Sequence, residues 1–276
     1  MSDEKLPPVE KDPRLNAIQE AQLDTPQGTH GTFELPCGYL DAEGVLHTQV
    51  HVREITGHEE DMLASKAVPG WKKISNLIDA CLTRVGNIAD PERVATVAGE
   101  LLVGDRVFLM FAIRRTTLGD EYPFRDKCPE CGYSGIFSLS LGDLDIKPMK
   151  DPRKRLFEVK LPSGLTARFH PLTGNDEEKL SKASNAKEAM SMSILLRLDM
   201  LGEKPATLGA VQALGMRDRN ALREAFDDHE GGVDTTLDMQ CPSCGAEFER
   251  DLDVGQAGFF FPSTMRKTSK ARSSMP

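Results

Sequence analysis

The sequence predicts an α+β fold built as a tandem duplication, in which each copy is a β-hairpin, a helical segment and a knuckle formed by a cysteine box. Three observations predict it. Four landmarks recur in the same order in both halves, strand-like and helix-like periodicities alternate in the same order, and each half closes with a CPxCG box. The chain has 276 residues, which is the length of roughly one to two ordinary domains.

The four landmarks lie at similar offsets along the chain. The pairs are LPCG at 35–38 with LPSG at 161–164, ITGHEEDML at 55–63 with LTGNDEEKL at 172–180, Asp105-Arg106 with Asp218-Arg219, and CPECG at 128–132 with CPSCG at 241–245. One match could arise by chance, but four in register indicate duplication of one ancestral module. The spacing between the first two landmarks is longer in the first copy, which predicts a longer hairpin there.

Alternating apolar residues predict a hairpin at the start of each copy. In the second copy, 157–161 and 165–169 alternate on either side of Pro162-Ser163-Gly164, which is a typical turn sequence. In the first copy, 46–53 alternate in the same way and form the returning strand.

Capping patterns mark where helices begin after each hairpin. Thr56 is followed by Glu59, and Thr173 by Asp176, and a hydroxyl residue with an acidic residue three positions later is typical of a capping box. The clusters of acidic residues there, with His58, are therefore interpreted as helix starts, which prefer negative charge.

Helical periodicity fills the middle of each copy. In the first copy, apolar stripes predict helices over 74–85, from Asp90-Pro91 to 102, and from Asp105 to 113. Weaker stripes at 194–198 and 221–226 predict the same helices in the second copy.

Composition sets the boundaries between segments. The predicted segments are a disordered N-terminal arm at 1–30, the first copy with its knuckle at 31–144, a linker at 145–155, the second copy with its knuckle at 156–254, and an aromatic and basic tail at 255–276.

The two CPxCG boxes predict one structural zinc ion bound by Cys128, Cys131, Cys241 and Cys244. Zinc favours four tetrahedral ligands, each C-x-x-C turn supplies two thiolates, and four thiolates leave no position for a catalytic water. We therefore expect one site that joins the two copies. The alternative, a redox pair, lacks the expected βαβ context.

Charge and motifs exclude several classes of protein. The formal net charge is −9, with 34 Lys+Arg and 43 Asp+Glu, which disfavours nucleic-acid binding by the whole protein. No apolar run is long enough for a membrane helix, and the polar start of the chain is unlike a signal peptide, so we expect a reducing cytoplasm. No nucleotide-binding loop, nucleophile elbow or zinc-protease motif is present in the sequence, so we expect no enzyme and no small-molecule substrate.

Three consecutive aromatic residues, Phe259, Phe260 and Phe261, lie near the end of the chain. Exposed aromatic side chains are typical of interface hot spots, so these residues are candidate partner contacts. The alternative is that they pack back onto the core of this chain.

Three motifs together resemble the baseplate protein family of contractile-tailed phages, of which the T4-type baseplate hub subunit is the model. They are the box Thr56 to Asp61, the box Leu101 to Arg106, and the strand from Tyr122 into Cys131. The resemblance implies a structural protein of the virion tail baseplate that contacts other tail proteins, such as hub, spike, tube or tape-measure subunits. The second copy departs from the pattern, because Met216-Arg217 replaces Val103-Gly104.

Two alternatives stay open at this stage. The chain could be a baseplate or tail assembly chaperone that is absent from the mature particle. It could also be a zinc-ribbon-like nucleic-acid or transcription-associated protein, which requires a basic face around the knuckles. A third interpretation, a hydrolase fused to a zinc module, needs a nucleophile with a base, and none is found.

Overall fold

The first body of the protein is a three-stranded antiparallel sheet covered by helices. The structure is a computed structural model that describes residues 29–183, 185–254 and 257–260. In chain order the elements of this body are β1 (His30–Leu40), β2 (Leu46–Arg53), α2 (Gly57–Ala64), α3 (Gly70–Cys81), β3 (Leu82–Val85), α4 (Pro91–Glu100) and α5 (Val103–Leu118). The strand order is β1-β2-β3.

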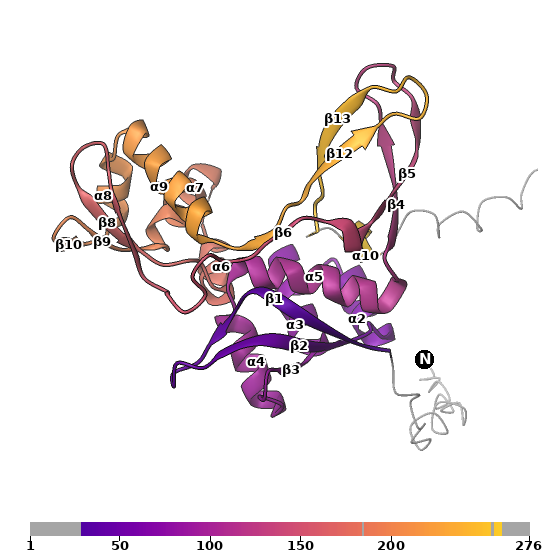
Figure 1. Cartoon of the computed structure of the whole chain (residues 1–276), viewed down its shortest axis with the longest axis horizontal. Coiled ribbons are helices and arrows are strands. Elements are labelled where there is room, and N and C mark those ends of the chain that lie inside the picture. The colour runs from indigo at the N-terminus through magenta and orange to yellow at the C-terminus, as the bar shows by residue number, and fades with distance from the viewer. Residues whose placement is uncertain (1–28, 184, 255–256, 261–276) are drawn as a thin grey trace, which may run out of the picture.

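The second body repeats this arrangement on a smaller scale beside the first (Figure 1). Its elements are β7 (Phe157–Lys160), β8 (Thr166–Phe169), α6 (Gly174–Leu180), α7 (Ala186–Leu195), β9 (Leu198–Leu201), β10 (Lys204–Pro205), α8 (Leu208–Ala213) and α9 (Met216–His229). The strand order is β10-β9-β8-β7, so a hairpin is again followed by a third strand from between the helices. The hairpin of the first body is the longer one, as the spacing predicts.

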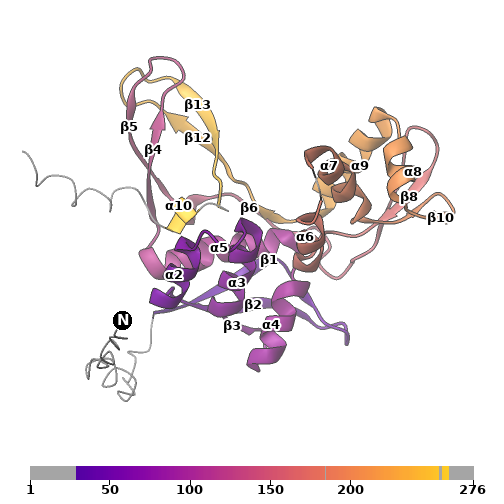
Figure 2. The same cartoon turned by 180° about the vertical axis from the view of Figure 1, so that it is seen from behind.

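Two further hairpins stand together beside the first body (Figures 1 and 2). They are β4 (Glu121–Lys127) with β5 (Ser134–Ser140), and β12 (Thr236–Gln240) with β13 (Glu247–Asp251). We call them the paired hairpins. A short turn, Leu141–Asp143, and the ribbon of β6 (Ile146–Lys147) with β11 (Gly232–Val233) connect them to the bodies, and α10 (Ala257–Phe260) ends the described chain.

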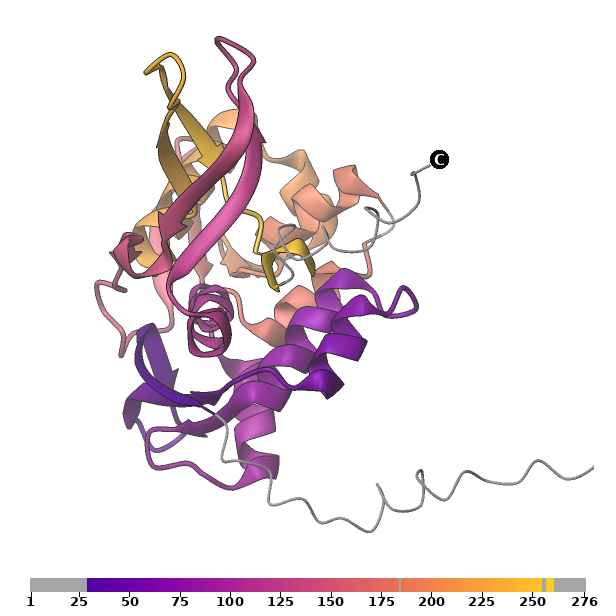
Figure 3. The ribbon, with the colours of Figure 1, turned by 90° about the vertical axis from the view of Figure 1, so that its right-hand side faces the viewer.

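Helix α5 is the centre of the larger core. It lies between the sheet of the first body on one side and the paired hairpins on the other, as the end-on view shows (Figure 3). All seven side chains from Phe108 to Arg114 are buried, because the helix is covered on every face. The second body has its own smaller core around Phe169, Leu222 and Phe226.

The predicted helix over 74–85 is wrong at its C-terminal end. Helix α3 ends at Cys81, and Leu82 and Val85 lie in β3, which pairs with β2. Both residues are buried, and their spacing of three positions fits a helix stripe, whereas in a strand positions 82 and 85 point to opposite faces, so the apolar pattern does not reveal β3. In the second body, Leu198 likewise belongs to β9 rather than to the predicted helix.

The residues of the two recurring Asp-Arg pairs make the same hydrogen bonds in both bodies. Asp105 Oδ1 accepts a hydrogen bond from the backbone N–H of Cys37 at 2.8 Å, and Asp218 Oδ1 accepts one from the N–H of Ser163 at 3.0 Å. Cys37 and Ser163 occupy the same position of LPCG and LPSG. Each aspartate therefore fastens the start of a long helix to its hairpin, at the register shift inside β1 in the first body and at the turn between β7 and β8 in the second.

The two arginines also correspond. Arg106 Nη1 donates to Ala98 O at 2.7 Å, and Arg219 Nη1 donates to Val211 O at 3.1 Å, in both cases eight residues back along the chain. The capping boxes at Thr56 and Thr173 are both formed as predicted.

The bodies are joined by backbone hydrogen bonds that the sequence patterns do not predict. Leu102 and Thr173 form an antiparallel bridge. The N–H of Val103 donates to Leu172 O at 2.9 Å, and the N–H of Gly174 donates to Leu101 O at 3.0 Å. We call this contact of 101–103 with 172–174 the junction.

Candidate metal centre

The four cysteines of the two CPxCG boxes come together at the tip of the paired hairpins. Their sulfur atoms all lie within 4.8 Å of one another. Cys128 Sγ is 3.8 Å from Cys244 Sγ, and Cys131 Sγ is 3.7 Å from Cys241 Sγ. The first cysteine of each box therefore faces the second cysteine of the other box.

Each box reaches this geometry through the same tight turn. The N–H of Cys128 donates to Tyr133 O, and the N–H of Cys241 donates to Ala246 O. The glycines that end the boxes close the turns with N–H groups that donate to Cys128 O and Cys241 O, and both have positive φ, 73° for Gly132 and 72° for Gly245. A side chain at this position would strain the backbone, which explains the glycine in CPxCG.

The sulfur spacing fits a tetrahedral metal ion. Zinc–thiolate bonds of about 2.3 Å in a tetrahedral site place the sulfur atoms about 3.8 Å apart. The two shortest sulfur–sulfur distances, 3.7 and 3.8 Å, agree with that value. The cluster is thus compatible with a metal site that uses all four thiolates.

Hydrogen bonds shift the pKa values of two thiols of the cluster in opposite directions. Burial opposes ionisation of the Cys241 thiol, but hydrogen bonds from the backbone N–H groups of Cys244 and Ser243 outweigh it and lower the pKa of Cys241 to about 7. The N–H of Ala246 favours the thiolate of Cys244, but the neighbouring sulfur of Cys131 outweighs this and raises the pKa of Cys244 to about 12. Hydrogen bonds among the sulfur atoms thus favour loss of the proton from Cys241 and hold the proton on Cys244.

Contacts below the cysteines hold the hairpins in register. Arg250 Nε donates to Asp126 Oδ2 at 2.6 Å, and Arg250 Nη2 donates to Lys127 O at 3.1 Å. The rings of Phe137 and Phe248 meet edge to face with centroids 6.1 Å apart. Sequence analysis did not predict these contacts between the hairpins. The available signal was the pair of opposite charges, Asp126 and Arg250, near the two CPxCG boxes.

One hollow on the paired hairpins is acidic rather than basic. A hollow on the second hairpin is lined by Asp238, Glu247 and Glu249 together with neutral residues. Acidic side chains repel nucleic-acid phosphates, so this hollow does not favour the zinc-ribbon nucleic-acid alternative.

Phe259 and Phe260 lie in α10 and are buried against the first body. Arg114 Nε donates to Phe259 O at 2.8 Å, and the Phe259 ring contacts Phe111 and Tyr122 with centroids 5.4 and 5.3 Å away. Of the two possibilities that the sequence left open, packing onto the core of this chain is the one that these two rings show. Phe261 lies outside the described residues.

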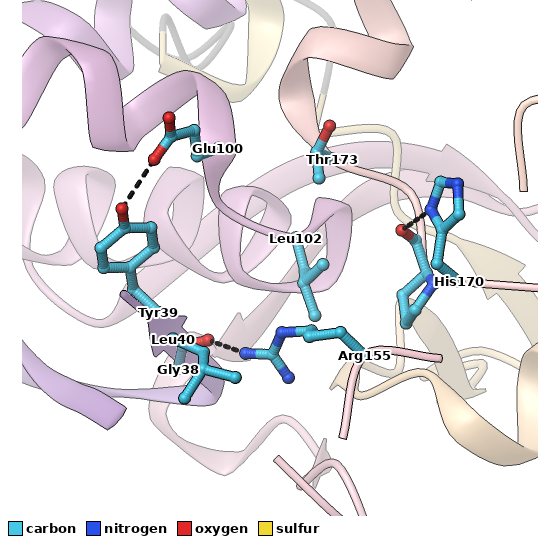
Figure 4. Close-up of a pocket in the computed structure, with 9 residues that line it drawn as sticks. Gly38, Tyr39, Leu40, Glu100, Leu102, Arg155, His170 and Thr173 are labelled. Carbon is cyan, nitrogen blue, oxygen red and sulfur yellow. Dashed lines mark hydrogen bonds between the residues drawn. The ribbon is translucent and has the colours of Figure 1, made fainter. Parts of the chain in front are cut away.

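A crevice of about 350 Å³ lies at the seam between the two bodies (Figure 4). Tyr39 Oη donates to Glu100 Oε2 at 2.6 Å, and Arg155 Nη2 donates to Gly38 O at 2.7 Å. Burial, with the Glu100 contact, raises the pKa of Tyr39 to about 12, so the phenol stays a hydrogen-bond donor. The polar side chains of the crevice thus tie segments of this chain to one another.

Comparison with known protein families identifies the chain. The family model described as T4 bacteriophage base plate protein matches residues 39–194, which is more than half of the chain, and the chain belongs to this family. The match begins in β1 and ends in α7, so it spans the first body, the first cysteine box and the start of the second body. No curated protein and no solved structure matches the chain.

Family membership gives the chain a structural role in the phage tail baseplate, a role that suggests a non-enzyme with tail proteins as partners. Within the described residues, no helix is both long enough and apolar enough to cross a membrane.

Proposed function

We propose that this chain is a structural component of the hub region of a contractile tail baseplate, and that one zinc ion bound by Cys128, Cys131, Cys241 and Cys244 holds its two halves together. The observation that carries the zinc is the convergence of four thiols, two pairs of which have the sulfur spacing of a tetrahedral zinc site, from boxes more than 100 residues apart. The observation that carries the role is the match to the baseplate family over 39–194.

We also propose that the chain arose by duplication. The matching hydrogen bonds of Asp105 with Asp218 and of Arg106 with Arg219 support this, as do the paired capping boxes and the equivalent third strands. The proposed segments are an arm at 1–30, the first copy at 31–144, a linker at 145–155, the second copy at 156–254 and a tail at 255–276.

In this proposal the zinc ion acts by bracing a surface for protein contacts. The cysteine cluster joins hairpins that lie far apart in sequence, and because the site exists only in the folded chain, the free energy of zinc binding adds to the free energy of folding. The rigid hairpins would then present a defined surface to hub, spike, tube or tape-measure proteins. Contact of Phe259–Phe261 with a partner is part of this proposal, and for the two buried rings it requires α10 to leave Arg114.

Metal analysis tests the site. We expect the purified protein to contain one zinc ion per chain, and Cys241→Ser to lose it, because three thiolates bind zinc more weakly than four. Amide exchange should then increase in β4, β5, β12 and β13, which would lose the brace. Cys81→Ala is the matched control, because Cys81 is buried in the first body away from the cluster and should keep the metal. Full zinc content in Cys241→Ser would refute the four-cysteine site.

Position in the particle tests the role. We expect a tagged chain to be present in mature virions and to co-purify with hub or spike proteins. Its presence in assembly intermediates but absence from mature particles would instead support the chaperone alternative.

A further inference from the structure

The junction pairs one short segment from each body, each of which leads into a helix, and we call such a segment an edge. The equivalent edge of the other copy is not paired in either body. In the first body the junction uses 101–103, which leads into α5, and in the second it uses 172–174, which leads into α6. By the alignment of the two copies, 101–103 corresponds to 214–216 and 172–174 corresponds to 55–57. The edge at 214–216 belongs to the second body, and the edge at 55–57 belongs to the first.

The unused edges have unpaired backbone groups where the junction has paired ones. The first N–H groups of α5 and α6, from Val103 and Gly174, are bonded across the junction. The corresponding groups of Met216 and Gly57 have no hydrogen-bond partner among the described residues, and both residues are exposed. Met216 is 65% exposed, the highest value among the large hydrophobic side chains of the described chain.

Gly57 gives a second observation. At the junction, a Cβ on Gly174 would lie 2.7 Å from the guanidinium of Arg106, so any larger residue there would have to displace the arginine. Gly57 occupies the same position of the first copy, yet it has no positive φ and nothing lies within 4 Å of where its Cβ would be. No contact within the described chain requires this glycine, whereas an arginine packed on it as Arg106 packs on Gly174 would require it.

The side chains around the unused edges complete the correspondence. Across the junction, Arg106 Nε donates to Glu177 Oε2 at 2.9 Å, and Arg106 is only 3% exposed. Arg219 makes the equivalent bonds within its own body, to Val211 O and Ser191 Oγ, but its Nε has no partner among the described residues. Glu60 is the counterpart of Glu177 and is exposed. Its carboxylate has no hydrogen-bond or ion-pair partner among the described residues either.

The two unused edges lie toward opposite ends of the molecule. Helix α2, which begins at the edge 55–57, lies at one end of the long axis, and α8 and α9, which flank the edge 214–216, lie at the other (Figures 1 and 2). A second molecule can therefore approach either edge without displacing the junction.

We propose that copies of this chain assemble head to tail, with the edge 214–216 of one molecule bound to the edge 55–57 of the next, so that the contact repeats the internal junction. Arg219 then pairs with Glu60 and packs on Gly57 of the neighbouring copy. This inference rests on the proposed duplication. A contact between two different patches generates rings or open filaments rather than closed dimers.

Two positions of the intermolecular contact differ from the junction. Gly99 and Asn175, which approach closely at the junction, correspond to Gln212 and His58. Both replacements are exposed side chains, so their ends can turn outward. The charge pair and the close glycine are kept.

The test uses two variants of the full chain that each block one edge. Glu60→Arg blocks the first edge and Met216→Asp blocks the second, and both residues are exposed, so folding should be unaffected. Glu203→Arg, an exposed charge reversal in a turn of the second body, is the matched control. Mass is measured by light scattering against concentration.

We expect the wild-type protein and the control to form multimers, and each blocked variant to be monomeric, with self-association weakened by about tenfold or more. Mixed in equal amounts, the two variants should form a 1:1 dimer and nothing larger, because each supplies the edge that the other lacks. A wild-type protein monomeric at about 100 µM would overturn the proposal, since a useful contact is tighter than that. Blocked variants that assemble normally, or a mixture that stays monomeric, would also overturn it. Zinc content and presence in the particle are read separately, so failure here is distinguishable from failure of the proposed function.

Discussion

The first and second bodies have the same hydrogen-bonding frame, which is the set of hydrogen bonds made by the Asp-Arg pair of each long helix. The surroundings of this frame differ between the two bodies. In α5, Asp105 and Arg106 are 0% and 3% exposed, because the junction and the paired hairpins cover the helix. In α9, Asp218 makes the same bond but Arg219 is only half-buried, and the helix has four buried residues. The comparison teaches that the hydrogen-bonding frame needs only a few residues. How apolar the rest of α5 or α9 is depends on which other parts of the molecule cover that helix.

Substituting the two arginines should give the largest contrast between the bodies. Arg106→Ala removes hydrogen bonds to Ala98 O, Ser75 Oγ and Glu177. We expect the free energy of unfolding to fall by about 3 kcal/mol, because a buried carbonyl and a carboxylate lose a charged donor. Arg219→Ala should cost about 1 kcal/mol, since Arg219 is less buried and lacks the carboxylate contact.

Urea unfolding measures both losses, with amide exchange at 172–174 as a local readout. Exchange there should increase in Arg106→Ala and stay unchanged in Arg219→Ala. Equal losses in the two variants would contradict the view that the junction, rather than the shared frame, makes Arg106 the more important arginine.

Sequence analysis found the features with local signatures and missed those set by distant contacts. The cysteine boxes, capping boxes and Asp-Arg pairs have fixed spacings, so the four thiols that meet at the hairpin tips could be listed in advance. The strand β3 was missed because the three-residue spacing of Leu82 and Val85 is that of a helix stripe, and only pairing with β2 selects the strand. The junction was missed because backbone hydrogen bonds between 101–103 and 172–174 leave no pattern of side-chain types.

The aromatic residues at the end of the described chain also depend on a distant contact that the sequence pattern does not reveal. Three consecutive phenylalanines indicate a buried contact but not whether the partner is the same chain. The Arg114 contact with Phe259 O seats α10 on the first body, and it joins residues 145 positions apart.

The buried aspartate of the first body should make stability depend on pH. Burial raises the pKa of Asp105 to about 6, and the N–H groups of Cys37 and Gly38 offset only part of this effect. The usual unfolded value is about 3.9. The folded protein therefore binds the proton more tightly, so this group's contribution to stability is complete below about pH 4 and is lost as pH rises through about 6.

Asp105→Asn removes that titration. Between pH 4 and 7, the difference in unfolding free energy between variant and wild type should shift in favour of the variant by on the order of 2–3 kcal/mol, since one pKa unit corresponds to about 1.4 kcal/mol. Urea unfolding at several pH values measures it, and Asp218→Asn controls for replacement of a carboxylate acceptor by an amide acceptor. A pH-independent difference for Asp105→Asn would show that the buried carboxyl does not titrate in this range.

The two matched glycines should give the smallest effect and the sharpest comparison. Gly174→Ala places a Cβ against the Arg106 guanidinium and should cost about 1 kcal/mol, because the junction has to shift. Gly57→Ala meets no atom and replaces glycine at the start of α2, so it should leave the stability of the isolated chain unchanged or raise it by about 0.5 kcal/mol. Thermal unfolding of the monomer at low concentration measures both. If Gly57→Ala also weakens self-association, the glycine is retained for a neighbouring copy. If it destabilises the monomer as much as Gly174→Ala does, Gly57 serves its own body and the correspondence between the two edges fails.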